Sequence, residues 1–274
     1  MTDEKHPKVE RRADRFADGV ESRIWLEQAS AENPYVAAAA FCHGYDLREL
    51  LASCSYWEYI YLLFTGRRCD PQQQALLEKI GIALANPGPR HPATRAVVAA
   101  SVSKTDPANI LPLGLSALSG AHLGAEEVGQ SMRFLRRRLK HDPLEEAALC
   151  IQERPPPGTG DVRPAPGFGT RFNGVDRLAV ELGNALMALR GAGAALAWAG
   201  AFAAELQRQE RGGWLMPGIA AAAFLDLGFH PKWGPGLFQW LSVPGLLAHA
   251  QEMSNKPLTA VPFIDDSRYF IDED

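Results

Sequence analysis

The sequence lacks several features that would assign it to a membrane, secreted or nucleic-acid-binding class. Its most apolar region, 191–204, is rich in alanine and glycine and falls short of the ~20 apolar residues that a membrane-spanning helix needs. Residues 1–22 are charged and contain no apolar segment, which predicts no cleaved signal peptide. The net charge of −4 offers no excess of positive charge to nucleic acid. We therefore expect a cytoplasmic protein that binds neither membranes nor nucleic acid.

Cysteine is scarce, and its spacing predicts neither a disulfide framework nor a metal site. The four cysteines are dispersed, with no Cys-x-x-Cys pair and no histidine cluster beyond the adjacent Cys42 and His43. They are Cys42, Cys54, Cys69 and Cys150. Dispersed thiols of this kind are typical of a reducing compartment.

Alternating apolar and polar residues, the pattern of strands, are nearly absent, and helical spacing takes their place. After Asp46, apolar residues recur at steps of three and four as far as Gly66, which is suited to ending a helix. These residues are Leu47, Leu50, Cys54, Trp57, Tyr61 and Phe64. The pattern predicts one amphipathic helix over 46–66 within an all-α fold.

Aspartate followed by proline marks the start of three further helices, because aspartate caps a helix whose first turn accepts proline. The dipeptides are Asp70-Pro71, Asp106-Pro107 and Asp142-Pro143. The predicted helices cover 70–85, 106–138 and 142–152, and others cover 92–103, 176–204, 219–227 and 236–253. We expect Pro244 to kink or divide the last one, and the proline-rich segment 154–166 to be an irregular linker.

A short basic run, Arg136-Arg137-Arg138 beside Lys140, has two interpretations. It is a solvated helix end, or it binds phosphate groups, which an acyl-CoA ligand would bring.

The loop Pro166-Gly167-Phe168-Gly169-Thr170-Arg171 is the most informative stretch of the chain. Its two glycines let backbone approach a ligand closely, and the planar guanidinium of Arg171 suits carboxylates. The loop predicts a site for an acidic ligand.

Seven further segments join this loop in a consistent order over residues 24–270. They are His43-Gly44-Tyr45-Asp46, Arg90-His91-Pro92-Ala93-Thr94-Arg95, Gly120-Ala121-His122-Leu123-Gly124-Ala125-Glu126-Glu127, Leu227-Gly228-Phe229-His230-Pro231, Ala248-His249-Ala250-Gln251-Glu252, Lys256-Pro257 and Arg268-Tyr269. The ordered set resembles the citrate synthase superfamily, especially its short citryl-CoA lyase-like members. The glycine loop is similar to their Gly-Phe-Gly-His-Arg, and the third segment to their Leu-His-Gly-Gly-Ala-Asn-Glu.

The resemblance implies an all-α, citrate synthase-like fold with two helical domains that close over the ligands. We expect a flexible arm over 1–22, a large domain over 23–124 and 229–274, and a small domain over 125–228. The implied partner is a second copy in a homodimer. The implied chemistry makes or breaks a carbon–carbon bond between an acyl-CoA and a 2-oxo acid, with the coenzyme A thioester as substrate rather than tightly bound cofactor.

Several catalytic positions of that family are altered here. Alignment on Gly124 places His122 on the first catalytic histidine, whereas alignment on Gly120 places Leu123 there; a structural helix-end histidine is the other interpretation. Thr170 stands on the second histidine, and threonine takes up no proton near neutral pH. Pro217 stands on the general-base aspartate. We expect Asp226, nine positions on, to face solvent.

The residues that bind ligand in the family have counterparts here. The resemblance implies that Arg171 binds a carboxylate and that Arg95, or Arg90, supplies a second cation. It implies ligand contact for His91 and Lys256, and contact with the coenzyme for Gly167, Phe168 and Gly169. The alternative to ligand binding for each of these cations is a surface ion pair that contributes little to stability. His249 is expected to be structural.

Three functions remain open. The first is an acyltransferase or lyase of the citrate synthase type, with His122 and Thr170 at the catalytic positions, that acts on or binds an acyl-CoA and a 2-oxo or tricarboxylic acid. The second is a catalytically inactive homologue that binds a ligand or partner, which Thr170 and Pro217 favour. The third is a helical scaffold unrelated to coenzyme A.

Overall fold

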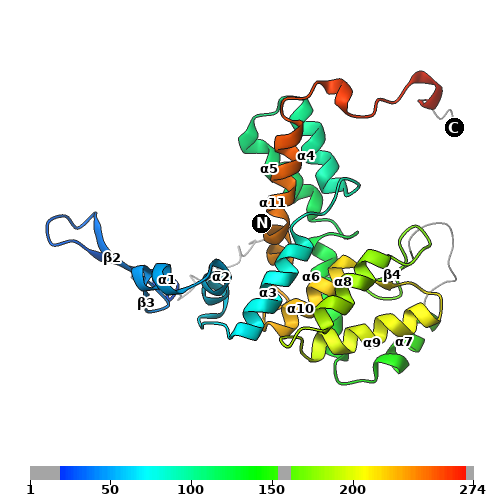
Figure 1. Cartoon of the computed structure of the whole chain (residues 1–274), viewed down its shortest axis with the longest axis horizontal. Coiled ribbons are helices and arrows are strands. Elements are labelled where there is room, and N and C mark those ends of the chain that lie inside the picture. The colour runs from blue at the N-terminus through cyan, green and yellow to red at the C-terminus, as the bar shows by residue number, and fades with distance from the viewer. Residues whose placement is uncertain (1–18, 154–161, 270–274) are drawn as a thin grey trace, which may run out of the picture. The chain divides into compact units, whose positions relative to one another are not determined.

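The computed structural model describes residues 19–153 and 162–269, and these divide into two compact units at Arg67 (Figure 1). Most of the arm predicted over 1–22 and most of the linker predicted over 154–166 lie outside the described residues. Within them, no helix is both long and apolar enough to cross a membrane.

The first unit places a small antiparallel sheet before two short helices. Its elements are β1 (Leu26–Ala29), β2 (Ala37–Cys42), β3 (Tyr45–Asp46), α1 (Leu47–Ser53) and α2 (Tyr56–Thr65). Cys42, Leu50 and Leu62 form its buried core. The strands were not foreseen, because the run Ala37–Cys42 carries no alternating pattern.

The single helix predicted over 46–66 is two helices, so this prediction was wrong at its middle. Cys54 is extended and ends α1, and the hydroxyl of Ser55 accepts a hydrogen bond from the Glu58 N–H in a capping box that starts α2. The predicted end is confirmed, since Gly66 closes α2 with a left-handed φ of +73°.

The second unit is helical apart from one two-residue strand pair. Its elements are α3 (Pro71–Leu84), α4 (Pro92–Val102), α5 (Pro107–Leu118), α6 (Ala125–Arg138), α7 (Pro143–Gln152), β4 (Phe168–Gly169), α8 (Arg177–Met187), α9 (Ala194–Arg208), β5 (Gly213–Trp214), α10 (Met216–Asp226), α11 (Gly234–Met253) and two 3-10 turns, Leu258–Ala260 and Asp266–Arg268. The predicted helical fold class is confirmed.

The three Asp-Pro starts are confirmed, and each aspartate caps its helix. The carboxylate of Asp70 accepts from the N–H groups of Gln72 and Gln73 at the start of α3. Asp142 accepts from two N–H groups in the same way at the start of α7, and Asp106 accepts from the N–H of Ala108 at the start of α5. The aspartate accepts from backbone N–H groups of the first turn, and the proline there has no N–H to satisfy. These interactions are local, so the sequence alone predicts them.

Two predicted continuous helices are each interrupted. The stretch over 106–138 breaks between α5 and α6, where a side chain on Gly124 would overlap the carbonyl oxygen of Gly120. The stretch from 176 breaks before α9, which Asp226 caps by accepting from the N–H groups of Gly193, Ala195 and Leu196 at 2.8–2.9 Å. Asp226 is therefore a half-buried cap, and the expectation that it faces solvent was wrong.

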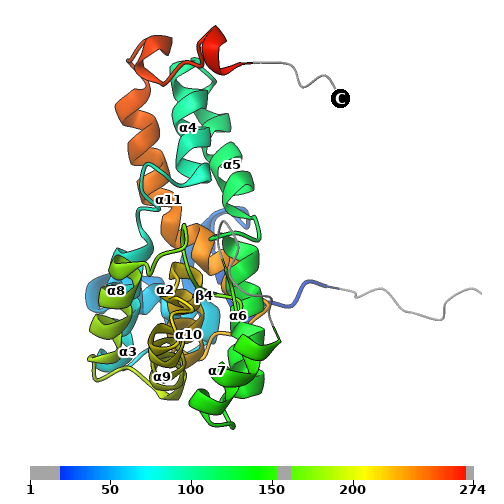
Figure 2. The same ribbon diagram turned by 90° about the vertical axis from the view of Figure 1, so that its right-hand side faces the viewer.

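The core of the second unit forms around α10, which is buried along almost its whole length and contacts α3, α6, α8 and α9. Small alanine side chains let these helices approach it closely. Helix α11 continues through Pro244 without dividing and runs beside α4 and α5 (Figure 2). Helices assigned to the predicted large and small domains pack together within 68–269, and that division stays a prediction.

Candidate functional site

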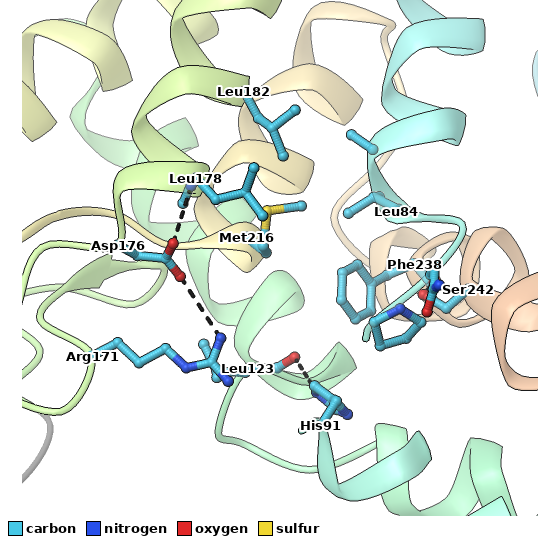
Figure 3. Close-up of a pocket in the computed structure, with 14 residues that line it drawn as sticks. Leu84, His91, Leu123, Arg171, Asp176, Leu178, Leu182, Met216, Phe238 and Ser242 are labelled. Atoms are coloured by element: carbon cyan, nitrogen blue, oxygen red, sulfur yellow. Dashed lines mark hydrogen bonds and ion pairs between the residues drawn. The ribbon is translucent and has the colours of Figure 1, made fainter. Parts of the chain in front are cut away.

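A cavity of about 170 Å³ opens where several helix ends of the second unit meet (Figure 3). Its lining comes from the end of α3 with the following loop, the starts of α4, α8 and α10, the loop before α6, and α11. Most of its walls are apolar, among them Leu84, Leu182, Met216 and Phe238. A volume below the ~300 Å³ of small ligand pockets suits one end of a large ligand.

A buried carboxylate holds the two loops that approach the cavity. Glu127, on the first turn of α6, accepts from the N–H of Leu123 at 2.7 Å and from the N–H of Gly167 at 3.0 Å. Arg163 donates to it at 3.0 Å. Since Gly167 opens the glycine loop, Glu127 fixes that loop against the turn that precedes α6.

His91 lies at the cavity with both ring nitrogens engaged. Its Nδ1 accepts from the N–H of Ala93 at 3.1 Å, so Nε2 carries the proton and donates to the carbonyl of Leu123 at 3.2 Å. Burial lowers the pKa of His91, the hydrogen bond to the Leu123 carbonyl opposes this in part, and the charge of Arg171 makes the smallest contribution, which lowers the pKa further. His91 is therefore a neutral helix cap with no nitrogen left for proton transfer.

Arg171 brings the only cation among the described residues that line the cavity. One guanidinium nitrogen lies 3.7 Å from a carboxylate oxygen of Asp176, whose other oxygen accepts from the N–H of Ala179 and caps α8 (Figure 3). A guanidinium has five N–H donors, so this single long contact leaves donors for a ligand. Asp176 and Arg171 together make the cavity polar on one side.

Two uncharged polar groups complete the lining. The buried hydroxyl of Ser242 donates to the carbonyl of Phe238, which leaves its lone pairs able to accept. The side-chain amide oxygen of Asn86 accepts from the N–H of Gly88 at 2.9 Å and lies 3.1 Å from Nε2 of His249. His249 thus joins α11 to the loop after α3, the structural role expected of it.

The glycines of the loop serve backbone packing and are not among the described residues that line the cavity. A side chain on Gly167 would meet Gly218, and one on Gly169 would meet Val162. Phe168 packs in the core, 5.0 Å from the ring of Phe202 between centroids. The backbone of the glycine loop therefore packs closely against other backbone of the protein, whereas the sequence pattern was expected to bring it close to a ligand.

Thr170 is also engaged within the protein. Its hydroxyl accepts from the N–H of Val162 at 3.0 Å, and its own N–H donates to the Val162 carbonyl at 2.8 Å. The side chain is buried and is not among the described lining residues. Pro217 is the second residue of α10 and is buried as well, so neither altered position presents a proton donor or acceptor to the cavity.

His122 is exposed and, within the described chain, does not line the cavity, whereas Leu123 does. Leu123 has a φ of +57°, a conformation that favours glycine. The alignment on Gly124 places Leu123 on a glycine of the Leu-His-Gly-Gly-Ala-Asn-Glu pattern. A left-handed φ at Leu123 is typical of a glycine position, and the choice between the two alignments stays a prediction.

The other predicted cations lie elsewhere. Arg95 and Arg90 are exposed, and Lys256 follows α11 with its amine 3.6 Å from Glu252. None of these three is among the described residues that line the cavity. Of the predicted site residues, the structure brings only His91 and Arg171 together there.

Sequence reasoning missed Asp176, Ser242 and Glu127 as parts of this site. Asp176 was read only as a helix start, and Glu127 only as part of a motif. The sequence predicted one helix over 106–138, so the position of Glu127 in the first turn of α6 gave no signal of this role. Ser242 carries no local signal, since only helix packing turns it to the cavity.

No protein-family model matches the sequence, and no curated protein matches it. Solved structures do match the fold. Citryl-CoA lyase from Hydrogenobacter thermophilus is 20% identical with a TM-score of 0.71, over 93% of this chain and 94% of that one. ATP citrate lyase from Methanothrix soehngenii, solved with citrate and coenzyme A, is 15% identical with a TM-score of 0.67, over 99% and 48%. Citrate synthase from Thermotoga maritima is 19% identical with a TM-score of 0.57, over 80% and 58%. The chain has a citrate synthase-like fold.

Proposed function

We propose that the protein binds a di- or tricarboxylate at Arg171, together with the thioester end of an acyl-CoA in the apolar part of the same cavity. The observation that carries this proposal is the guanidinium of Arg171 in a mostly apolar cavity, with one ion pair of 3.7 Å to Asp176 and a position over the ring of Phe172, 5.6 Å from its centre. Ion pairing is stronger where apolar walls exclude water, and a planar fork of donors matches a carboxylate.

The acyl-CoA half of the proposal is supported by the fold and by the cavity's walls. Leu84, Met216 and Phe238 offer an apolar surface to a short acyl chain. The similar ATP citrate lyase was solved with citrate and coenzyme A. In our proposal the thioester is a substrate-like ligand that exchanges freely.

Calorimetric titration with citrate and with acetyl-CoA tests this function. Arg171→Ala should weaken citrate binding about 10–100-fold, because a charge-assisted contact of ~1.5–3 kcal/mol is lost. Arg95→Ala is the matched control, as it removes an exposed arginine outside the cavity lining. Equal loss in both variants, or no citrate binding by the wild type, would refute the proposal.

A second candidate function is carbon–carbon cleavage or condensation of a citryl-CoA type, and Asp176 favours it. Its carboxylate lines the cavity beside Arg171 and is the acid-base group left there once His91 is neutral and capped. In this role it would accept a proton from the substrate hydroxyl or carbon. Mass spectrometry of citryl-CoA incubated with wild type and with Asp176→Asn separates catalysis from binding. Turnover that Asp176→Asn retains would exclude Asp176 as the base, and no turnover at all leaves an inactive, ligand-binding homologue.

We also propose a homodimer in the cytoplasm. Large apolar side chains are exposed in the first unit and near the C-terminus, with Val20, Tyr35 and Phe263 each more than nine-tenths exposed. Apolar surface of this kind marks interaction sites, and a second copy of the chain is the occupant we propose. All four cysteines are described and no disulfide joins them, in keeping with a reducing compartment. Sedimentation velocity at micromolar concentration should give twice the monomer mass of 29.9 kDa.

A further inference from the structure

The opposite end of α6 carries a second hollow, lined by basic side chains from two separate segments. Arg133, Arg136 and Arg137 come from the last turns of α6, and His230 and Lys232 come from the turn before α11. The hollow has a volume of about 540 Å³ and shares no lining residue with the cavity at Arg171. Residues 125 and 137, near the two ends of α6, are ~18 Å apart along the helix axis, at 1.5 Å per residue.

The cations of this hollow have no acidic partners among the residues that the structure describes. No ion pair with a described residue forms at Arg133, Arg136, Arg137 or Lys232, and the amine of Lys232 lies 5.2 Å from the ring centre of Trp233. The nearby carboxylate of Asp226 accepts hydrogen bonds from three backbone N–H groups at the start of α9. Like charges gathered in this way repel one another, and a bound anion relieves that repulsion.

The basic run 136–138 therefore splits into two roles. Arg138 turns to the buried Glu146, 3.0 Å away, and supports the structure. Arg136 and Arg137 turn to the hollow, where they meet residues almost a hundred positions later. A solvated helix end accounts for arginines on α6 but not for their convergence with His230 and Lys232.

We infer that this hollow is a second anion site that takes a ligand with two or more linked phosphate groups. Arg133 and Arg137 are one turn apart, ~6 Å along the helix axis, so the positive charge extends along a line that a phosphate chain can follow. Arginine forks and a lysine point charge both bind phosphate oxygens. The positive N-terminal end of α11, which begins two residues after Lys232, and the negative C-terminal end of α6 carry opposite partial charges, so the full charges of the arginines and the lysine account for the attraction.

A mostly apolar hollow of about 350 Å³ adjoins the cations, shares Arg136, His230 and Pro231 with them, and also has Asp226 in its lining. Leu139, Leu225 and Phe229 contribute to its walls. A free phosphate chain would leave this hollow empty, whereas a nucleoside polyphosphate would place its base there. Both sources have the same phosphate chemistry, and titration distinguishes them.

Calorimetry with tripolyphosphate, ATP, adenosine and citrate, on the full chain, tests the inference. Tripolyphosphate should bind, and Arg136→Gln/Lys232→Gln should weaken it at least tenfold. The control Lys140→Gln/Arg190→Gln makes the same charge change on exposed residues outside the hollow and should leave binding unchanged. Raising the salt concentration should weaken binding in the wild type, because these charges are exposed and screened. Circular dichroism and thermal melts of both double variants confirm that they fold.

The remaining arms decide between outcomes. ATP that binds more tightly than tripolyphosphate assigns a nucleotide, and equal affinity assigns a phosphate chain alone. No tripolyphosphate or ATP binding, equal loss in the control, or tighter binding of citrate at this hollow would overturn the inference. Arg171→Ala should leave tripolyphosphate binding intact, and its loss in that variant would show that there is only one anion site. Failure of the citrate titration at Arg171 has no bearing on this result.

Discussion

The two ends of α6 hold charged residues in opposite ways. At its N-terminal end Glu127 is buried, and its carboxylate accepts from the nearby N–H of Leu123 and from Arg163 and Gly167, which are distant in sequence. At its C-terminal end Arg136 and Arg137 are exposed and line a hollow with other cations. A charged group that is paired within the protein stabilises the fold, whereas a charged group without a partner in the protein is available to bind a ligand. Residue type does not distinguish these roles, but the set of partners does.

The largest loss of stability is expected from a substitution at the N-terminal end of α6. Glu127→Ala should lower the free energy of unfolding by about 3–5 kcal/mol, because Arg163 loses its buried counter-charge and two N–H groups lose their acceptor. Urea denaturation followed by circular dichroism measures this. The neighbouring Glu126→Ala removes an exposed carboxylate and should stay within ~0.5 kcal/mol. Similar losses in both variants would contradict the anchoring role of Glu127.

A smaller loss is expected at the other saturated carboxylate. Asp226→Ala removes the acceptor for three N–H groups at the start of α9 and should cost about 1–2 kcal/mol, as for the loss of a helix cap. Asp226→Asn keeps one acceptor oxygen and should recover part of the stability. Thermal melts of the three proteins rank them, and an unchanged melting temperature in Asp226→Ala would show that water replaces the cap.

The pH dependence of stability tests the neutral state of His91. Its folded pKa lies below the ordinary value, so the unfolded chain binds more protons as the pH falls. This contribution to stability is complete above the unfolded pKa of about 6.5 and is lost as the pH falls through the folded pKa. His91→Asn keeps a helix cap without a titrating group and should flatten the stability curve in this window. A curve of unchanged slope would mean that other groups cause it.

The smallest change in stability is expected from substitutions at the hollow beside the C-terminal end of α6. Arg136→Gln/Lys232→Gln should change the free energy of unfolding by no more than ~0.5 kcal/mol without ligand, with a slight gain at low salt as repulsion falls. Chemical denaturation at two salt concentrations measures it. A loss above ~1 kcal/mol would show that these cations hold structure, and the contrast between the two ends of α6 would fail.

Local signals in the sequence predicted the helix starts well and the helix interruptions poorly. Asp70 and Asp142 cap helices through N–H groups two and three residues away, so a short window contains the whole interaction. The break before α9 depends on Asp226, which is thirty residues or more from the groups that it caps. No helical periodicity reports a contact over that distance.

The sequence likewise predicted one part of the candidate site and missed another. Arg171 was predicted from its glycine loop and lines the cavity, but the glycines themselves pack against Gly218 and Val162. The lack of an acid-base side chain at Thr170 and Pro217 follows from the residue types, while the engagement of His91 depends on the Leu123 carbonyl, 32 positions away.

The amino-acid sequence by itself determined the helical class, the helix starts and the absence of histidine and aspartate from two expected positions, because these follow from residue chemistry and neighbours. Only the tertiary structure decided which polar side chains are saturated and which remain open. Glu127 meets Gly167 forty positions away, and Arg136 meets Lys232 at a greater separation still. Partners at such distances are chosen by the packing of whole helices.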